Sequence, residues 1–358
     1  MVGYIKHKIY IPEEDVDMNA IEKAYQFDNF EDTACDRCPY KKDRPNEYCQ
    51  TCQAYLGLIR MWSRKVINGK SYILIPSGNM KRASEITGID FSTYKDLRCC
   101  APFESGLKWT GQLRHGEMVN GVPSANQEEL VEKWLQPHKR YGFIQAPPRT
   151  GKSVCGVYLS CAIGYKTLFV AHQTELLENF YKSFVRDTNL LELREETGKE
   201  IVSIINSPKD YEKMKDLDVA LVTYQKFIRE DTRDKFIKEY IKGRFGFVIT
   251  DEAHQAGAAS YARFLSQLDC RYKLGMSATP LRKDALNRVL FNCIGPVTVK
   301  SESTGLIPRI EIFETGIKEK SSYCWAKTMQ KLQKNEKRNK LILKEVVKDL
   351  KEHKVILI

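Results

Sequence analysis

The stretch Phe143–Val154, FIQAPPRTGKSV, joins a short apolar run to a polar turn that contains Gly-Lys-Ser. This order is typical of a phosphate-binding loop, in which backbone N–H groups point at phosphate oxygens where a helix begins. Thr150, Gly151, Lys152 and Ser153 can supply such donors. The lysine can reach the β and γ phosphates of a nucleoside triphosphate, and the serine hydroxyl can bind Mg²⁺. The stretch therefore predicts a nucleotide site between a strand and a helix.

The loop departs from the usual pattern in its first half. Ala146 stands where the pattern has its first glycine, and Pro147 and Pro148 carry no backbone N–H. We expect the two prolines only to shape the turn, while Arg149 adds a positive charge to the nucleotide site. A Gly-Lys-Ser triplet that arose by chance is the alternative, and its position between an apolar run and a helical stretch argues against that reading.

Short apolar runs recur along the middle of the chain, each followed by polar or turn residues. They are rich in Val, Ile, Leu and Phe and alternate with helical stretches, which is typical of a buried parallel sheet with crossover helices. The runs are YGFIQA (141–146), KTLFVAH (166–172), IVSIIN (201–206), VALVTY (219–224), FGFVITDEAH (245–254) and YKLGMSATP (272–280). In such sheets ligands bind beyond the carboxyl ends of the strands, which is where the polar motifs lie.

One of these runs, Phe247–His254, ends in two carboxylates. We expect Asp251 to hold Mg²⁺, directly or through water, and Glu252 to orient and deprotonate the water that attacks the γ phosphate. His254 would couple this site to neighbouring loops. Two solvated surface acids are the alternative, but a strand end roughly a hundred residues after a phosphate loop favours the catalytic interpretation.

Composition limits the class of protein. The 358 residues indicate two or three domains, and 57 basic against 46 acidic residues give a formal net charge of +11. This excess favours a polyanionic partner, nucleic acid first, with a merely basic enzyme as the alternative. No apolar run approaches the roughly 18 residues of a membrane span, and the start has no signal-peptide core. We therefore expect a cytoplasmic protein with no membrane partner.

The region before the phosphate loop is less regular. YIKHKIYI (4–11) predicts a short strand, and an acidic helical segment follows it. The stretch 55–78 indicates a helix, a turn at Asn68-Gly69 and a strand from Ser71 to Ile75. A helix over NQEELVEKWL (126–135) would place Leu130, Trp134 and Leu135 on one face. Trp109 either packs in a core or stacks on adenine or another base.

Four cysteines form two pairs, Cys35 with Cys38 and Cys49 with Cys52, and two residues separate the members of each pair. Each pair can aim two thiolates at one point, so the quartet predicts a tetrahedral metal site. Zinc is the default, and iron, in a cluster or alone, uses the same ligands. Four unrelated buried thiols are the alternative, but DRCPYKKDRPNEYC is too polar for a core. Its basic residues either contact DNA phosphates or form a solvated surface.

Three motifs in order resemble motifs I, II and III of superfamily-2 helicases and translocases. They are APPRTGKS (146–153), DEAH (251–254) and SATP (277–280), and the resemblance covers roughly residues 109–358. SATPLRKD, with Arg282 and Asp284, is similar to the XPB-like and UvsW-like branch and to phage-type branch-migration helicases. The resemblance implies an α/β fold of the P-loop NTPase class, a RecA-like parallel sheet with flanking helices.

The resemblance also implies roles at the nucleotide. Gln127 would recognise adenine, with Arg114, thirteen positions earlier, as a candidate partner. Ser277 and Thr279 would bond the motif II carboxylate or His254 and relay the state of the γ phosphate. The loop differs from the family by carrying Pro148-Arg149 where Thr-Gly is usual.

Two further elements of the family contact the nucleic-acid backbone. ELLENF (175–180) is similar to motif Ia, and VTYQ (222–225) resembles the Thr-Tyr-Gln element after it. The implied contact residues are Gln173, Thr174, Thr223, Tyr224 and Gln225. Thr174 replaces a common arginine, which puts one phosphate contact in doubt.

This interpretation divides the chain into three parts. They are a small α+β N-terminal domain with the metal site (1–112), a RecA-like ATP-binding domain (113–315), and a linker helix with the truncated start of a second RecA-like domain (316–358). KVILI (354–358) reads as the first strand of that second domain. We therefore expect the arginine finger of the second domain to lie beyond this sequence, and we expect ATP turnover by the chain as given to be slow.

The implied function is an ATP-dependent DNA helicase or translocase in recombination, repair or replication. Its partner would be single-stranded, duplex or branched DNA, and its cofactors would be ATP, Mg²⁺ and Zn²⁺. A monomer is the favoured oligomeric state. Two alternatives remain open: an RNA helicase, and a DNA-binding targeting or restriction-type subunit with a regulatory nucleotide site.

Overall fold

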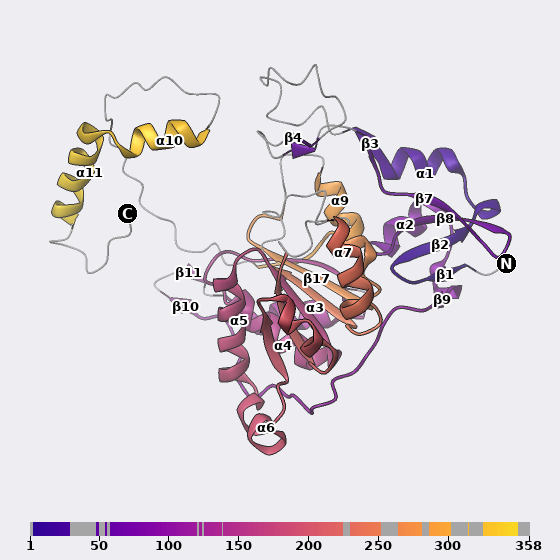
Figure 1. Cartoon of the computed structure of the whole chain (residues 1–358), viewed down its shortest axis with the longest axis horizontal. Helices are drawn as coiled ribbons and strands as arrows, with labels where there is room; N and C mark the ends of the chain where they lie inside the picture. Colours follow the sequence, from indigo (N-terminus) through magenta and orange to yellow (C-terminus); the bar gives the residue numbers. More distant parts are fainter. Residues whose placement is uncertain are drawn as a thin grey trace. The chain divides into compact units, whose positions relative to one another are not determined.

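The structure is a computed structural model (Figure 1). It describes residues 3–28, 48–49, 54–55, 58–119, 122–123, 125–137, 139–224, 230–251, 264–280, 286–301, 314 and 325–349. The chain divides into two compact units, residues 1–306 and 307–358. The described part of the second unit forms two helices, α10 (Trp325–Gln333) and α11 (Glu336–Asp349). No helix among the described residues is both long and apolar enough to cross a membrane.

A seven-stranded sheet forms the centre of the first unit, and its neighbouring strands run parallel. In order across the sheet the strands are β14 (Val202–Ile205), β15 (Val219–Thr223), β13 (Thr167–Ala171), β16 (Phe247–Asp251), β17 (Tyr272–Ser277), β12 (Gly142–Gln145) and β18 (Val297–Lys300). Six of them coincide with the predicted apolar runs, so the expected parallel α/β sheet is confirmed. The edge strand β18 is not among the predicted runs, because VTVK is short and only one of its side chains is buried.

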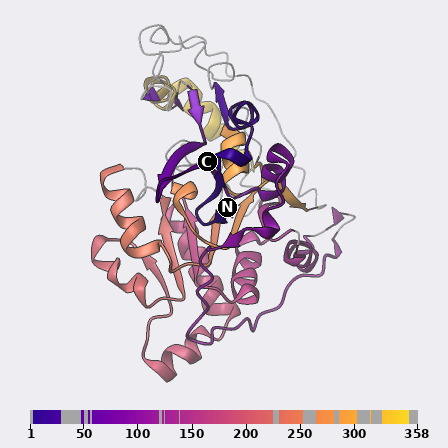
Figure 2. The same cartoon turned by 90° about the vertical axis from the view of Figure 1, so that its right-hand side faces the viewer.

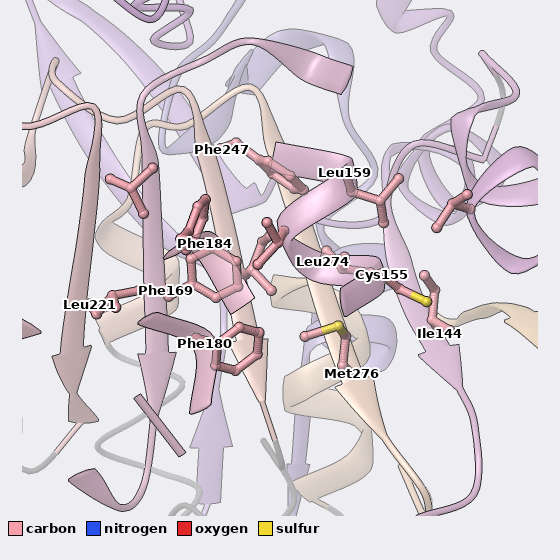
Figure 3. Close-up of a cluster of buried hydrophobic side chains, with 14 of the residues drawn as sticks. Ile144, Cys155, Leu159, Phe169, Phe180, Phe184, Leu221, Phe247, Leu274 and Met276 are labelled. Carbon is pink, nitrogen blue, oxygen red and sulfur yellow. The ribbon is translucent and has the colours of Figure 1, made fainter. Parts of the chain in front are cut away.

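Helices cover both faces of this sheet. They are α3 (Gln127–Leu135), α4 (Lys152–Ile163), α5 (Thr174–Asp187), α6 (Leu190–Thr197), α7 (Glu230–Phe236), which continues into a π-helical turn (Ile237–Ile241), and α9 (Leu286–Cys293). Side chains along β13 alternate between the two layers, because successive residues of a strand point to opposite faces. Leu168 and Val170 join one apolar cluster, and Phe169 joins the cluster under α4 and α5, where Phe180 and Phe184 contact it (Figure 3).

The buried face of helix α3 differs slightly from the predicted one. Its first turn is capped by Asn126, whose side chain accepts a hydrogen bond from the backbone N–H of Glu129. Leu130, Val131 and Trp134 are buried, whereas Leu135 is only half-buried. Val131 therefore takes the core position that was expected for Leu135.

A second, five-stranded sheet is formed by the N-terminal residues. In order across the sheet its strands are β7 (Ser63–Ile67), β8 (Lys70–Pro76), β2 (Lys8–Pro12), β1 (Tyr4–Ile5) and β9 (Lys95–Asp96). Helices α1 (Met18–Tyr25) and α2 (Met80–Thr87) pack on one face over a cluster of isoleucines. Among the described residues of this unit there are also three two-stranded sheets: β3 (Gln26–Asp28) with β6 (Leu58–Arg60), β4 (Tyr48–Cys49) with β5 (Ala54–Tyr55), and β10 (Met118–Val119) with β11 (Val122–Pro123).

The helix predicted before the Asn68-Gly69 turn is wrong. The chain forms strands β6 and β7 there, and β7 pairs with β8 as a hairpin. The turn itself is confirmed, since Asn68 and Gly69 have φ of 50° and 76°. Two successive residues with positive φ form the tight turn that matches the twist of paired strands, so the turn selects a hairpin over a helix.

Residues of the N-terminal sheet and of the segment after it contact the strands and helices of the seven-stranded sheet directly. Asp96 at the end of β9 forms an ion pair with Arg271, the residue before β17. The backbone N–H of Gly78 donates to the carbonyl oxygen of Asn292 in α9. A β-carbon at Gly78 would lie 2.1 Å from the backbone of Cys293, so only glycine permits this approach.

Candidate functional site

The phosphate loop runs from Ala146 to Gly151, between strand β12 and helix α4. Arg149 and Gly151 both adopt left-handed backbone conformations, with φ of 67° and 80°. The hydroxyl of Thr150 donates to the carbonyl oxygen of Pro147 at 2.9 Å, which closes the turn. The loop therefore curls tightly in front of the amino end of α4, as phosphate binding by backbone N–H groups requires.

Lys152 is the first residue of α4, and its side chain folds back along the loop. Its Nζ donates to the carbonyl oxygens of Ala146 at 3.1 Å and Pro147 at 3.3 Å. Its neighbour Ser153 lies half-buried in the same first turn. The ammonium group and the serine hydroxyl thus belong to the helix turn that begins at the loop.

Asp251 ends strand β16 and is only 7% exposed. It pairs in register with Met276 of β17, and on the other side of β17 Ser277 pairs with Gln145 of β12. Neighbouring strands lie about 4.8 Å apart, so the backbone of Asp251 lies roughly 10 Å from the start of the phosphate loop. The structure therefore brings the lysine loop and the carboxylate to one edge of one sheet. Glu252 and His254, the other two predicted members, lie outside the described residues.

The segment after β17 is tied to the start of the phosphate loop. The backbone N–H of Ala146 donates to the carbonyl oxygen of Ser277 at 3.1 Å, and Nε2 of Gln145 donates to that of Ala278 at 3.3 Å. Ser277 is fully buried, and its hydroxyl oxygen accepts the N–H of Thr279 at 3.1 Å. A displacement of the loop would therefore also displace Ser277 and Thr279 through these hydrogen bonds.

Gln127, the predicted adenine reader, is 1% exposed. Its Nε2 donates to the carbonyl oxygen of Thr150 at 2.9 Å, and its Oε1 accepts the backbone N–H of Arg114 at 3.1 Å. A side-chain amide has two donor hydrogens and two acceptor lone pairs, so one of each remains for a further partner. The backbones of Arg114 and Gln127 are also bonded, at 2.9 Å, although thirteen positions separate them. The sequence spacing did not indicate this contact.

Cys155, in the second turn of α4, is buried beside the site. Burial raises the pKa of its thiol to about 12, and the nearby charges of Arg114 and Lys152 pull in the opposite direction. The thiol therefore stays protonated and packs as a small apolar group. Trp109 packs at the surface of the same core, edge-on to Tyr158 of α4 at 5.4 Å between ring centroids.

The predicted nucleic-acid contacts lie farther along the same edge of the sheet. Gln173 and Thr174 are exposed at the start of α5, just beyond β13. Thr223 ends β15, in register with Ala171 of β13, and half-buried Tyr224 follows it. Gln225 lies outside the described residues. Four of the five residues thus lie at or just beyond the carboxyl ends of two neighbouring strands, β13 and β15.

A basic cleft lies at the opposite end of the sheet. It has a volume of about 910 Å³ and lies between helix α2 and the beginnings of β12 and β18. Lys81 and Arg82 of α2 line it together with Lys139, one acid, Glu85, and the ring of Tyr141. Cations beside an aromatic ring suit the phosphates and bases of a nucleic-acid strand. Sequence reasoning missed this cleft, because Lys139 follows Lys81 and Arg82 by more than fifty positions.

The predicted metal site cannot be followed through its side chains. Cys35, Cys38 and Cys52 lie outside the described residues, and of Cys49 only the backbone, in β4, is described. Within the ranges that the structure describes, no group of three or more His, Cys, Asp or Glu side chains could hold a metal ion.

Residues 120–282 match the protein family described as "Type III restriction enzyme, res subunit". L396 of Acanthamoeba polyphaga mimivirus, named as a candidate ATP-dependent RNA helicase, is 25% identical over 244 residues, 67% of this chain and 42% of that protein. The XPB helicase/translocase subunit of general transcription and DNA repair factor IIH from Danio rerio is 25% identical over 198 residues, 52% of this chain and 24% of XPB. The chain thus spans less than half the length of either relative.

The fold is shared with a solved helicase structure. The crystal structure of the UvsW helicase from Bacteriophage T4 is similar with a TM-score of 0.52 and 19% identity. The similarity covers 84% of this chain and 98% of that one. The similarity therefore extends beyond the strands and helices of the seven-stranded sheet.

Proposed function

Because this chain carries a superfamily-2 helicase domain of the XPB-like and UvsW-like type, we propose that it hydrolyses ATP to move along DNA. The observation that carries the proposal is that two strands flank β17 in one sheet: β12, which leads into the loop before Lys152, and β16, which ends at Asp251. The proposed action is in recombination, repair or replication.

In this proposal the phosphate loop binds the triphosphate. Backbone N–H groups from Thr150 to Ser153 donate to phosphate oxygens, and the ammonium of Lys152 moves from the loop carbonyls to the β and γ phosphates. Gln127 holds the loop through Thr150 and uses its remaining donor and acceptor for adenine. Glu252 orients and deprotonates the attacking water.

The oxygen ligands at this edge suit Mg²⁺, which prefers carboxylate and hydroxyl oxygens. Asp251 is a nearly buried carboxylate at a strand end, and Ser153 lies in the helix turn beside the loop. Mg²⁺ held there would neutralise charge on the β and γ phosphates as the bond breaks. Ser277, Thr279 and His254 would pass the state of the γ phosphate toward the nucleic acid.

DNA is the proposed partner, and it would contact both ends of the sheet. One strand would run over Gln173, Thr174, Thr223, Tyr224 and Gln225 at the carboxyl edge. Lys81, Arg82 and Lys139 in the basic cleft would hold phosphates of another arm, which favours a branched substrate.

We further propose that Cys35, Cys38, Cys49 and Cys52 bind zinc, with iron as the less favoured metal. These cysteines would lie in a small N-terminal domain (1–112), which precedes the ATP-binding domain (113–315) and the linker (316–358).

The decisive experiment compares nucleic acids as activators of ATP hydrolysis. We expect single-stranded or forked DNA to stimulate the wild-type protein more than RNA of the same sequence, and Lys152→Ala to abolish the stimulated rate. Stronger stimulation by RNA would favour the second candidate, an RNA helicase, which the name of the mimivirus relative supports. Tight DNA binding with no turnover would favour a restriction-type subunit, as the matched family description indicates.

A further inference from the structure

Residues 97–116, here called the strap, connect the N-terminal sheet to the segment before α3. The strap passes beneath the seven-stranded sheet, at the edge where its strands begin (Figure 2). The carbonyl oxygen of Cys99 accepts the N–H of Arg271, just before β17. The carbonyl oxygen of Ala101 accepts the N–H of Lys166, just before β13. The strap thus lies at the edge opposite the phosphate loop.

Asp218 fastens the middle of the strap. This aspartate precedes β15 and is 2% exposed. Its carboxylate accepts the backbone N–H groups of Glu104 and Ser105, each at 2.9 Å, and the hydroxyl of Ser105. A buried carboxylate is stable only when donors satisfy it, and these three donors all belong to the strap. An ion pair between Lys166 and Glu104, at 2.8 Å, adds a second fastening.

The next part of the strap is pinned to helices α5 and α4. The N–H groups of Thr110 and Gly111 both donate to the carbonyl oxygen of Asp187, at 2.9 and 3.0 Å. A β-carbon at Gly111 would lie 2.9 Å from that of Asp187, so the contact requires a residue without a side chain. Trp109 packs against Tyr158 of α4, the helix that begins at the phosphate loop.

The strap then reaches the nucleotide site. The backbone of Arg114 forms hydrogen bonds with both the backbone and the side chain of Gln127. Gln127 in turn donates to Thr150 of the loop. A β-carbon at Gly151 would lie 2.1 Å from Nε2 of Gln127, so the glutamine amide lies directly against the loop. Bonds and packing therefore run without interruption from Asp218 to the loop.

We propose that the strap holds the phosphate loop in its nucleotide-binding shape, with Gln127 and Asp218 as positioning residues. The loop needs such support because Arg149 is held in a left-handed conformation that a non-glycine residue leaves unless its surroundings enforce it. Strand β15 has five residues, so Asp218 lies roughly 16 Å from the opposite edge and does not touch the nucleotide. This inference rests on the proposed function, since it assumes that the loop binds ATP.

The test compares Asp218→Asn with Asp216→Asn, an exposed carboxylate two residues away. Hydrogen exchange is followed for the peptides that contain 104–105 and 146–151, and the dissociation constant is measured for a fluorescent ATP analogue with Mg²⁺. We expect Asp218→Asn to speed exchange in both peptides and to weaken binding roughly fivefold to tenfold, a usual size for coupling between distant sites. Asp216→Asn should change neither quantity.

A second variant separates positioning from general loss of stability. Gln127→Ala removes the link between strap and loop, so in that background Asp218→Asn should no longer weaken nucleotide binding. Faster exchange at 104–105 with an unchanged loop and dissociation constant would overturn the inference. Equal weakening by Asp218→Asn with and without Gln127 would also overturn it. Failure of the wild-type protein to bind the analogue contradicts the proposed function itself, and normal binding by every variant contradicts only the inference.

Discussion

The backbone N–H of Ala146 donates a hydrogen bond to the carbonyl oxygen of Ser277 at 3.1 Å. The phosphate loop and the Ser-Ala-Thr-Pro segment therefore leave the sheet from one shared point. Two strands away, Asp251 ends β16 on the same edge. This arrangement joins the phosphate loop to two motifs that follow it by more than a hundred positions in the sequence.

Lys152→Ala should abolish ATP hydrolysis while leaving the fold intact. The side chain is half-buried and donates hydrogen bonds to the loop carbonyls of Ala146 and Pro147, and loss of these bonds should cost only about 1 kcal/mol of folding stability. Removal of one charged donor from a transition state typically slows turnover roughly 100-fold or more. Steady-state ATPase rates and thermal unfolding would measure the two effects. Lys182→Ala, at an exposed position of α5, is the matched control, and normal turnover by Lys152→Ala would refute the site assignment.

Arg149→Gly should fold at least as well as the wild-type protein. A left-handed residue with a side chain costs about 1–2 kcal/mol, and glycine removes that cost but gains roughly 0.4–1 kcal/mol of unfolded-state entropy. We therefore expect a net change within about 1 kcal/mol in urea unfolding, whereas Arg149→Val should destabilise by about 1–2 kcal/mol because a β-branched residue fits φ of 67° poorly. Equal stability of the two variants would contradict the backbone argument.

The parallel sheet could be predicted because its central strands are apolar at every position. All five residues of β13 are buried, so TLFVA stands out in the sequence. Edge and hairpin strands gave weaker signals: β18 has one buried residue, and the pattern of β7, with three exposed residues, follows from its pairing with β8. Both were therefore missed.

Residues that act through distant contacts were also beyond sequence reasoning. Asp218 reads as a surface acid before an apolar run, and its burial follows from strap donors more than a hundred positions earlier. The thirteen positions between Arg114 and Gln127 gave no sign that the two residues are in contact, yet the fold places their backbones within hydrogen-bonding distance. The motifs could be recognised locally, whereas their supports are set by the tertiary structure.

His7 should make folding stability depend on pH. Burial first, and then the charges of Lys242, Lys8, Lys273 and Lys6, lower the pKa of this histidine from 6.5 to about 3. The unfolded chain therefore binds a proton below pH 6.5 that the folded chain refuses, so this stability is complete above pH 6.5 and is lost as the pH falls toward 3. The loss should reach about 1.4 kcal/mol per pH unit at most.

Chemical unfolding at pH 7 and pH 5 would measure this effect. His7→Gln cannot titrate, so it should lose up to about 2 kcal/mol less than the wild-type protein between these values. Lys70→Gln, at an exposed position of β8, is the control and should lose as much stability between the two pH values as the wild type does. The prediction fails if wild type and His7→Gln show the same difference.

The double variant Lys81→Glu/Arg82→Glu should weaken DNA binding through the basic cleft. Each neutralised phosphate contributes about one to the slope of log K against log salt, so loss of two contacts should lower that slope by roughly two. Fluorescence anisotropy with forked and single-stranded DNA at two salt concentrations would measure it, and the forked substrate should suffer more. Lys95→Glu, exposed on β9, changes charge outside the cleft. An equal effect from Lys95→Glu would mean that the cleft residues act only through the general positive charge of the protein and form no specific DNA-binding site.

Cys35→Ser and Cys49→Ser should each remove most of the bound metal from the purified protein. Four thiolates close a tetrahedral zinc site, and loss of one leaves a position that only water or serine oxygen, a poorer ligand, can fill. Elemental analysis after dialysis against a chelator would give the metal content and distinguish zinc from iron. Cys100→Ser, at an exposed free thiol, should retain the wild-type content. Unchanged metal content in both quartet variants would exclude a four-cysteine site.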